Sequence, residues 1–216
     1  MTHEEQMRAA ALAKRIKRDR VFLNNPVVMQ GLGLAPLIVA AATLKNALML
    51  AVAVALLLTP TRVVAAFLSK FPLFRFRGLT YALTAAAVYA GVLAVMTRLY
   101  SAADIGLLGL YLPLLCADPI VLKRYERPQR ERIRTALKKG VITTAGYVLA
   151  MLLTAAVREF LGTGCLYGHA LLGYSPLPIA SLPMGGFIVL ALLIAAWRGV
   201  TNIIKRQMAL GVKQQA

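Results

Sequence analysis

The sequence predicts an all-α membrane protein whose six transmembrane helices form a 3+3 inverted repeat, with the first and fourth helices broken. Three observations predict this fold. The chain has 216 residues, is 59% hydrophobic and contains several apolar runs long enough to cross a bilayer. If the chain crosses the membrane six times, most of its Lys and Arg residues fall in segments on the same side of the membrane. Two short apolar segments, one in each half of the chain, are interrupted by glycine and proline.

The apolar runs define the expected elements in order. The first segment opens at NNPVVMQGLGLAPL and the fourth contains GLLGLYLP, so both are short and interrupted. The second and third runs are almost free of polar groups. The sixth begins at SLPMGG and ends near Trp197, where an interfacial aromatic residue is expected. The predicted spans are 27–44, 46–68, 78–98, 104–122, 140–158 and 180–200.

Positive charge predicts the orientation of these spans. With both termini in the cytoplasm, 22 of the 25 Lys and Arg residues fall in cytoplasmic segments. The three others are Lys45, Arg98 and Arg158. We therefore expect a multi-pass protein of the bacterial cytoplasmic membrane. The expected division of the chain is a basic cytoplasmic arm at 1–25, a membrane domain at 26–204 and a cytoplasmic tail at 205–216.

The net charge of +17 has two interpretations that the sequence leaves open. The basic arm is either a solvated determinant of topology or an amphipathic helix on anionic lipid, since Leu12 and Ile16 have helical spacing. A nucleic-acid-binding protein is excluded because such proteins are seldom this hydrophobic. No cleavable signal peptide is expected, because the arm has no apolar core.

The interrupted segments predict a seam between two half-helices. Three spans are an odd number, so the second half enters the membrane from the opposite side, and the broken helices of such repeats meet near the midplane. Close packing through small residues is the alternative explanation for the glycines. The predicted seam residues are Gln30, Gly31, Gly33, Ala35, Pro36, Pro113, Cys116, Asp118 and Pro119.

Four stretches of the chain resemble one family of membrane subunits. They are NNPVVMQGLGLAPL, LGLYLPLLCADPIVLKRYE, REFLGTGCLYG and LPMGGFIVLALLIA. The chain is similar in these to the E subunit of the Rnf electron-transport complex and the D subunit of the sodium-translocating NADH:quinone reductase (Nqr). The resemblance implies a homologous, inverted membrane subunit as partner, alongside other subunits of the complex. It also implies a [2Fe–2S] cluster between the two, with two cysteines from each.

This sequence departs from the family at both cysteine positions, which are Ala35 and Pro119 here. Neither side chain offers a ligand atom to iron, so we expect the chain alone to bind no cluster. The two cysteines, Cys116 and Cys165, lack the spacing of a metal site. Asp118 is either an ion or proton site or a carboxylate held by the basic loop that follows it.

The resulting hypothesis is a membrane subunit of an Rnf/Nqr-like complex that couples electron transfer to ion translocation. We expect the subunit to act as a scaffold, with no catalytic activity alone. The alternative is a redox-independent inverted-repeat transporter or a homodimeric paralogue. The neighbouring charges Arg158 and Glu159 are expected to form an ion pair at the outer membrane boundary.

Overall fold

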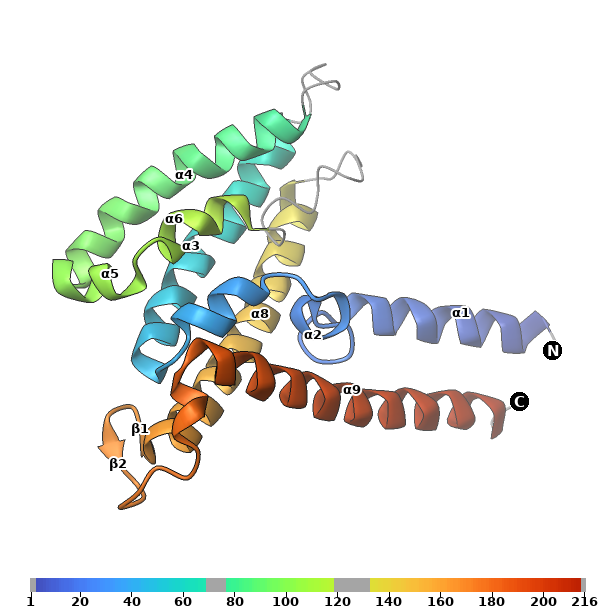
Figure 1. Ribbon diagram of the computed structural model, residues 1–216. Coiled ribbons are helices and arrows are strands. Elements are labelled where there is room, and N and C mark those ends of the chain that lie inside the picture. Colours follow the sequence, from blue (N-terminus) through green and yellow to red (C-terminus); the bar gives the residue numbers. More distant parts are fainter. Residues whose placement is uncertain (1–2, 69–76, 119–132, 215–216) are drawn as a thin grey trace.

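The computed structural model describes residues 3–68, 77–118 and 133–214 of the chain. This part of the chain is mostly helical (Figure 1). By length and composition, helices long and apolar enough to cross a membrane are found within α3 (Leu44–Leu68), α4 (Arg77–Leu99), α8 (Ile133–Thr163) and α9 (Pro183–Gln214). At about 1.5 Å per residue, the 31 residues of α8 extend for about 46 Å, which exceeds the apolar thickness of a bilayer.

The remaining elements are short, apart from the N-terminal helix α1 (His3–Arg18). The first apolar segment consists of α2 (Pro26–Gln30) and the π-helix η1 (Pro36–Ala40). Three further short helices come after α4: α5 (Ala102–Leu108), α6 (Tyr111–Leu114) and the 3-10 helix η3 (Leu115–Ala117). Residues 119–132, which follow them, lie outside the described part of the chain. Strands β1 (Cys165–Leu166) and β2 (His169–Ala170) form a small antiparallel hairpin, and the 3-10 helix η5 (Pro178–Ser181) leads into α9.

Helix α3 lies at the centre of the bundle, with α8 along one side and α4 along another (Figure 1). Its residues Met49, Leu50 and Leu57 are buried, as are Tyr147 and Met151 of α8. Because lipid is as apolar as these side chains, their packing stabilises the bundle mainly through van der Waals contact. The short elements α2 and η1 contact α8 and α9, so the core holds the interrupted first segment in place.

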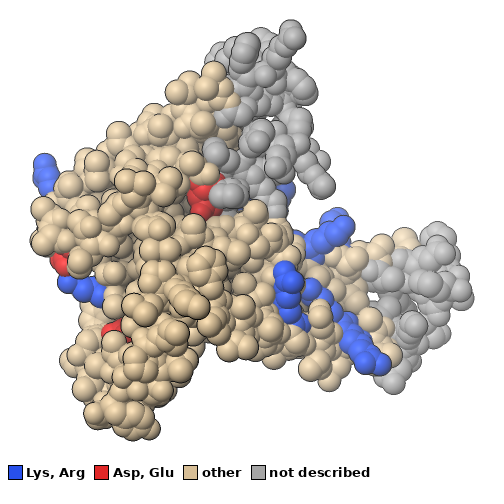
Figure 2. Space-filling model, in the orientation of Figure 1, with Lys and Arg blue, Asp and Glu red and all other residues tan. Residues whose placement is uncertain are grey.

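Helices α1 and α9 contact each other and extend away from the bundle as an arm that carries both termini (Figure 1). Figure 2 shows Lys and Arg side chains on this arm, while the broad face of the bundle is almost free of charge. Trp197 of α9, expected at the membrane interface, is 8% exposed. Its ring packs against Phe22 with centroids 5.3 Å apart, and its Nε1 donates a hydrogen bond to the Phe22 carbonyl at 3.2 Å.

The second, third, fifth and sixth predicted spans coincide with α3, α4, α8 and α9. The first predicted span, and residues 104–118 of the fourth, are built from short helices joined by non-helical residues. Helix α9 continues without interruption from the sixth predicted span to Gln214, and so includes residues 205–214 of the predicted cytoplasmic tail. A mostly helical membrane protein is thus confirmed, and the number and pairing of its spans remain a prediction.

Candidate functional site

The interruption of the first segment is produced by local residue chemistry. The Asn25 side chain caps α2 by accepting hydrogen bonds from the backbone of Val27 and Val28, and Pro26 occupies the first helical turn. Gly31 ends the helix with φ +65°, a left-handed conformation that disfavours residues with a Cβ. Gly33 follows with φ +69°, so the chain turns twice before η1 begins.

Side chains from α8 and α9 donate hydrogen bonds to backbone carbonyls at this interruption. The Tyr147 hydroxyl donates to the Gly33 carbonyl at 3.1 Å, in a buried position. Nε of Arg198 donates to the carbonyl of Val28 at 2.8 Å. Unpaired backbone groups are costly away from water, so these two contacts stabilise a non-helical segment among apolar helices.

Arg158 makes the most extensive set of these contacts. Its side chain is completely buried in α8, and its three nitrogens donate to carbonyls of η1, the turn after η1, and the stretch leading into α9. No carboxylate among the residues that the structure describes pairs with it. The acceptors are the carbonyls of Leu37 (3.3 Å), Ile38 (2.6 Å), Ala41 (3.2 Å), Ala180 (3.1 Å), Ser181 (3.4 Å) and Leu182 (3.2 Å).

Glu159 binds backbone N–H groups instead of its neighbour Arg158. Its carboxylate accepts from the N–H of Leu44 at 2.7 Å, at the start of α3, and from the N–H of Gly168 at 3.0 Å, in the hairpin. The expected ion pair between Arg158 and Glu159 is therefore wrong. The cation lies at the carboxyl end of η1 and the anion at the amino end of α3, which are the signs that the helix dipoles favour.

The predicted seam residues of the first segment occupy different environments. Gln30, at the end of α2, is exposed and makes no side-chain hydrogen bond within the described residues. A Cβ added at Gly31 would meet no atom of the chain within 4 Å. Glycine is therefore favoured here by the positive φ of the backbone and not by tight packing within the chain. Ala35 is exposed, whereas Pro36 is buried at the start of η1.

The fourth segment is interrupted at Gly109, which has φ +51° and lies between α5 and α6. Pro113 is exposed within α6. Cys116 is half-buried, and its thiol donates to the Ala85 carbonyl at 3.8 Å. Asp118 is 8% exposed at the end of η3; Pro119 and the basic loop expected to hold Asp118 lie outside the described residues. The role of Asp118 as an ion or proton site stays a prediction.

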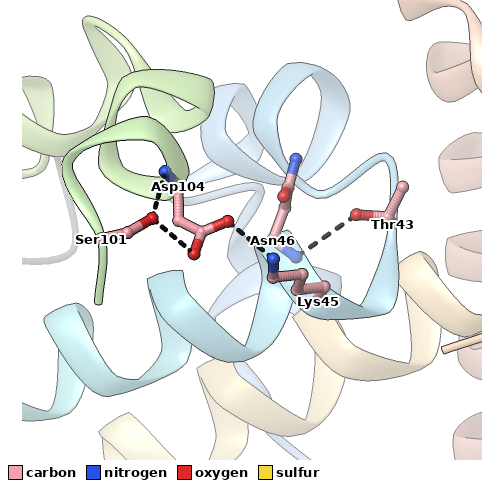
Figure 3. Close-up of polar contacts among 5 residues, drawn as sticks. All are labelled: Thr43, Lys45, Asn46, Ser101 and Asp104. Carbon is pink, nitrogen blue, oxygen red and sulfur yellow. Dashed lines mark hydrogen bonds and ion pairs between the residues drawn. The ribbon is translucent and has the colours of Figure 1, made fainter. Parts of the chain in front are cut away.

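An ion pair joins α3 to α5 (Figure 3). Nζ of Lys45 donates to Oδ1 of Asp104 at 2.6 Å, and the Ser101 hydroxyl donates to Oδ2 of the same carboxylate at 2.9 Å. Ser101 also caps α5 by accepting from the Asp104 N–H at 3.2 Å. One carboxylate thus fixes the start of α5 to the start of α3, next to the turn that Arg158 and Glu159 hold.

The residues at the two positions where the family resemblance implies cysteine carry no ligand atom for an iron–sulfur cluster, and the second of them, Pro119, lies outside the described residues. At the first position, Ala35 presents only a methyl group. The thiol of Cys165 contacts the Thr163 carbonyl at 3.6 Å, beside the hairpin. Within the described ranges, no three His, Cys, Asp or Glu side chains lie close enough together to bind a metal ion.

Sequence reasoning missed the three side chains that bind the interrupted segment, Tyr147, Arg158 and Arg198. A signal for Arg158 was present, because an ionisable residue within an apolar run is a functional candidate by default. Its position among the few basic residues outside the cytoplasmic segments led us to place it at the membrane boundary. Tyr147 and Arg198 carried no comparable signal.

These features define a multi-pass membrane protein in which side chains of α8 and α9 hold an interrupted helical segment. The chain belongs to the family described as "Rnf-Nqr subunit, membrane protein", whose model matches residues 13–194. It is 31% identical over 204 residues to a protein of Shewanella sp. (strain ANA-3) named as the E subunit of an ion-translocating oxidoreductase complex, covering 87% of this chain and 86% of that protein. The protein of the same name from Shewanella baltica (strain OS185) is 30% identical over 207 residues, with the same coverage.

Proposed function

We propose that the chain is a membrane subunit of an Rnf-like complex that couples electron transfer to ion translocation, and that it acts there as a scaffold. The observation that carries this proposal is the interrupted first segment, fixed by Tyr147, Arg158 and Arg198. A rigid, non-helical segment at membrane depth is typical of repeat proteins that form a functional seam. The names of the relatives support the assignment to an ion-translocating oxidoreductase complex.

The proposed architecture has six spans in two inverted halves. Each half begins with a segment interrupted at a glycine with positive φ, at Gly31 and Gly33 in the first and Gly109 in the second. The partner is a homologous membrane subunit of opposite orientation, and the interrupted segments of the two subunits face each other. Both termini lie in the cytoplasm, and the complex resides in the bacterial cytoplasmic membrane.

The scaffold role separates this subunit from its cluster-binding relatives. Because Ala35 and Pro119 offer no thiolate, any cluster at the seam takes its ligands from other chains. The subunit then supplies shape, a low-dielectric surrounding and fixed backbone dipoles at the seam. Asp118, buried at the end of the fourth segment, is the candidate for binding an ion or a proton there.

Affinity purification from the native membrane tests the proposal. A tagged chain is expected to carry with it a second membrane subunit of the same family, together with flavin- and iron-containing subunits, identified by mass spectrometry. Recovery of the chain alone or as a homodimer, with no redox protein, would contradict a role in electron transport and favour the transporter alternative.

A Cys116→Ser variant tests the scaffold role within the same complex. Cys116 is the one thiol of the interrupted fourth segment, and it is bonded to the Ala85 carbonyl. The proposal expects the variant complex to keep its iron content and its rate of electron transfer. Loss of iron in stoichiometric amount would identify Cys116 as a ligand and refute the scaffold role. Cys165→Ser, in the hairpin beside α8, is the matched control.

A further inference from the structure

The surroundings of Arg158 resemble a binding site for a cation. Six carbonyl oxygens, from three separate stretches of the chain, lie 2.6–3.4 Å from its guanidinium nitrogens. Carbonyls at the carboxyl end of a broken helix are what membrane transporters use to coordinate cations. In this chain the cation among the carbonyls is the guanidinium group of Arg158, which belongs to the protein itself.

The acceptors match a planar cation with several N–H groups. A guanidinium group has five N–H donors in one plane, and all three of its nitrogens are used here. Hard metal cations such as calcium and magnesium instead need oxygens at about 2.0–2.6 Å. The carbonyls around Arg158 are divided among the three nitrogen atoms of a planar group, an arrangement that suits a guanidinium better than a single metal ion.

Helix α9 closes this site through a glycine. A Cβ placed on Gly186 would lie 2.7 Å from the Ile38 carbonyl oxygen and 2.8 Å from Cζ of Arg158. The first turn of α9 therefore lies directly against both the cation and one of its acceptors. Because any side chain at Gly186 would displace one of them, this close approach ties α9 to the interrupted first segment.

From these contacts, we propose that Arg158 is a tethered cation that fills a carbonyl site between η1 and the start of α9. A free guanidinium-type cation binds the same site once the Arg158 side chain is shortened. In the native chain the site is closed to free cations, because a second positive charge at this distance would be repelled and would find no unoccupied carbonyl. This last step rests on the proposed function: because Arg158 occupies the carbonyls, the transported ion does not bind at this site and is repelled from it.

Chemical rescue of an Arg158→Ala variant tests this inference on the purified full-length chain. We expect ethylguanidinium at millimolar concentration to raise the Tm of the variant, and ethylurea, a neutral analogue of the same shape, to leave it unchanged. The Tm of the wild-type chain should respond to neither compound, since its site is filled. A ligand that binds only the folded state stabilises it by RT ln(1 + L/Kd), where L is the free ligand concentration, so the Tm rises with ligand concentration.

Several outcomes would overturn the inference. One is an equal response of wild type and variant to ethylguanidinium, and another is an equal effect of ethylurea. Stabilisation of the variant by sodium chloride as strong as that by ethylguanidinium would refute a site shaped for a planar cation. The experiment uses the chain without partner subunits, so its failure is distinct from failure of the proposed function.

If the Arg158→Ala protein does not accumulate in the cells that express it, a pair of glycine variants tests the inference instead. Gly186→Ala should lower the Tm and the yield, because its Cβ would displace Arg158 or the Ile38 carbonyl. Gly199→Ala, on the same helix, is the control, since a Cβ there meets no atom within 4 Å. The same Tm for the two variants would show that α9 does not close a site around Arg158.

Discussion

Replacement of Tyr147 by phenylalanine removes one oxygen atom and one hydrogen bond from the interrupted first segment. The Tyr147 side chain is 1% exposed, and its hydroxyl binds the carbonyl of the buried Gly33 at 3.1 Å. The variant leaves that carbonyl buried without this donor, which costs about 1–3 kcal/mol. For a chain of about 200 residues, 1 kcal/mol lowers Tm by about 3 °C. The expected loss for Tyr147→Phe is therefore about 3–9 °C.

The assay is thermal unfolding of the purified chain in detergent, followed by loss of the monodisperse peak on size exclusion. Tyr174→Phe serves as the matched control, because Tyr174 is 68% exposed and its side chain makes no hydrogen bond within the described residues. The control should unfold at the wild-type temperature. An unchanged Tm for Tyr147→Phe, or an equal loss in the control, would refute the view that α8 stabilises the interruption through this bond.

Three further predictions concern the Gly31 backbone, the membrane topology and the partner contact of Gln30. Gly31→Ala should lower the Tm, because a left-handed φ of +65° costs a residue with a Cβ about 1–2 kcal/mol. Gly91→Ala, in helix α4, should leave the Tm unchanged or raise it. Equal shifts of the Tm in the two variants would contradict this interpretation. A thiol placed at Lys138 should react with a membrane-impermeant maleimide only from the cytoplasm, and one at Ser175 only from outside; the reverse pattern would overturn the topology. Gln30→Leu should not change the Tm of the isolated chain but should reduce co-purification of the partner subunit, and normal recovery would place the residue away from the seam.

The positions of the interruptions could be predicted because their causes are local. Gly31, Gly33 and Gly109 adopt positive φ where the sequence places glycine within an apolar run, and Pro36 and Pro113 lie beside these sites. The long helices could be predicted equally well, because a long apolar run is itself the sequence signal of a membrane-spanning helix.

The contacts that hold the interruptions could not be predicted, because they join residues far apart in the chain. Tyr147 and Gly33 are separated by 114 positions, and no pattern in one sequence pairs them.

The expected pairing of Arg158 with Glu159 failed for a geometric reason. Consecutive residues on a helix do not face each other, so their side chains point to different neighbours. Arg158 is directed to η1 and the approach to α9, and Glu159 is directed to the start of α3 and the hairpin. Opposite charges that are adjacent in a helix therefore predict two separate contacts better than one ion pair.

The distance along the chain between Arg158 and its acceptors sets an order of events during synthesis. The carbonyls of Leu37 and Ile38 leave the ribosome 120 or more residues before the side chain that binds them. At about 5–20 residues per second, this delay lasts roughly 6–24 s. Until α8 has been made, Arg158 cannot bind these carbonyls. The contacts that hold the first segment therefore form only after the second half of the membrane domain has been synthesised.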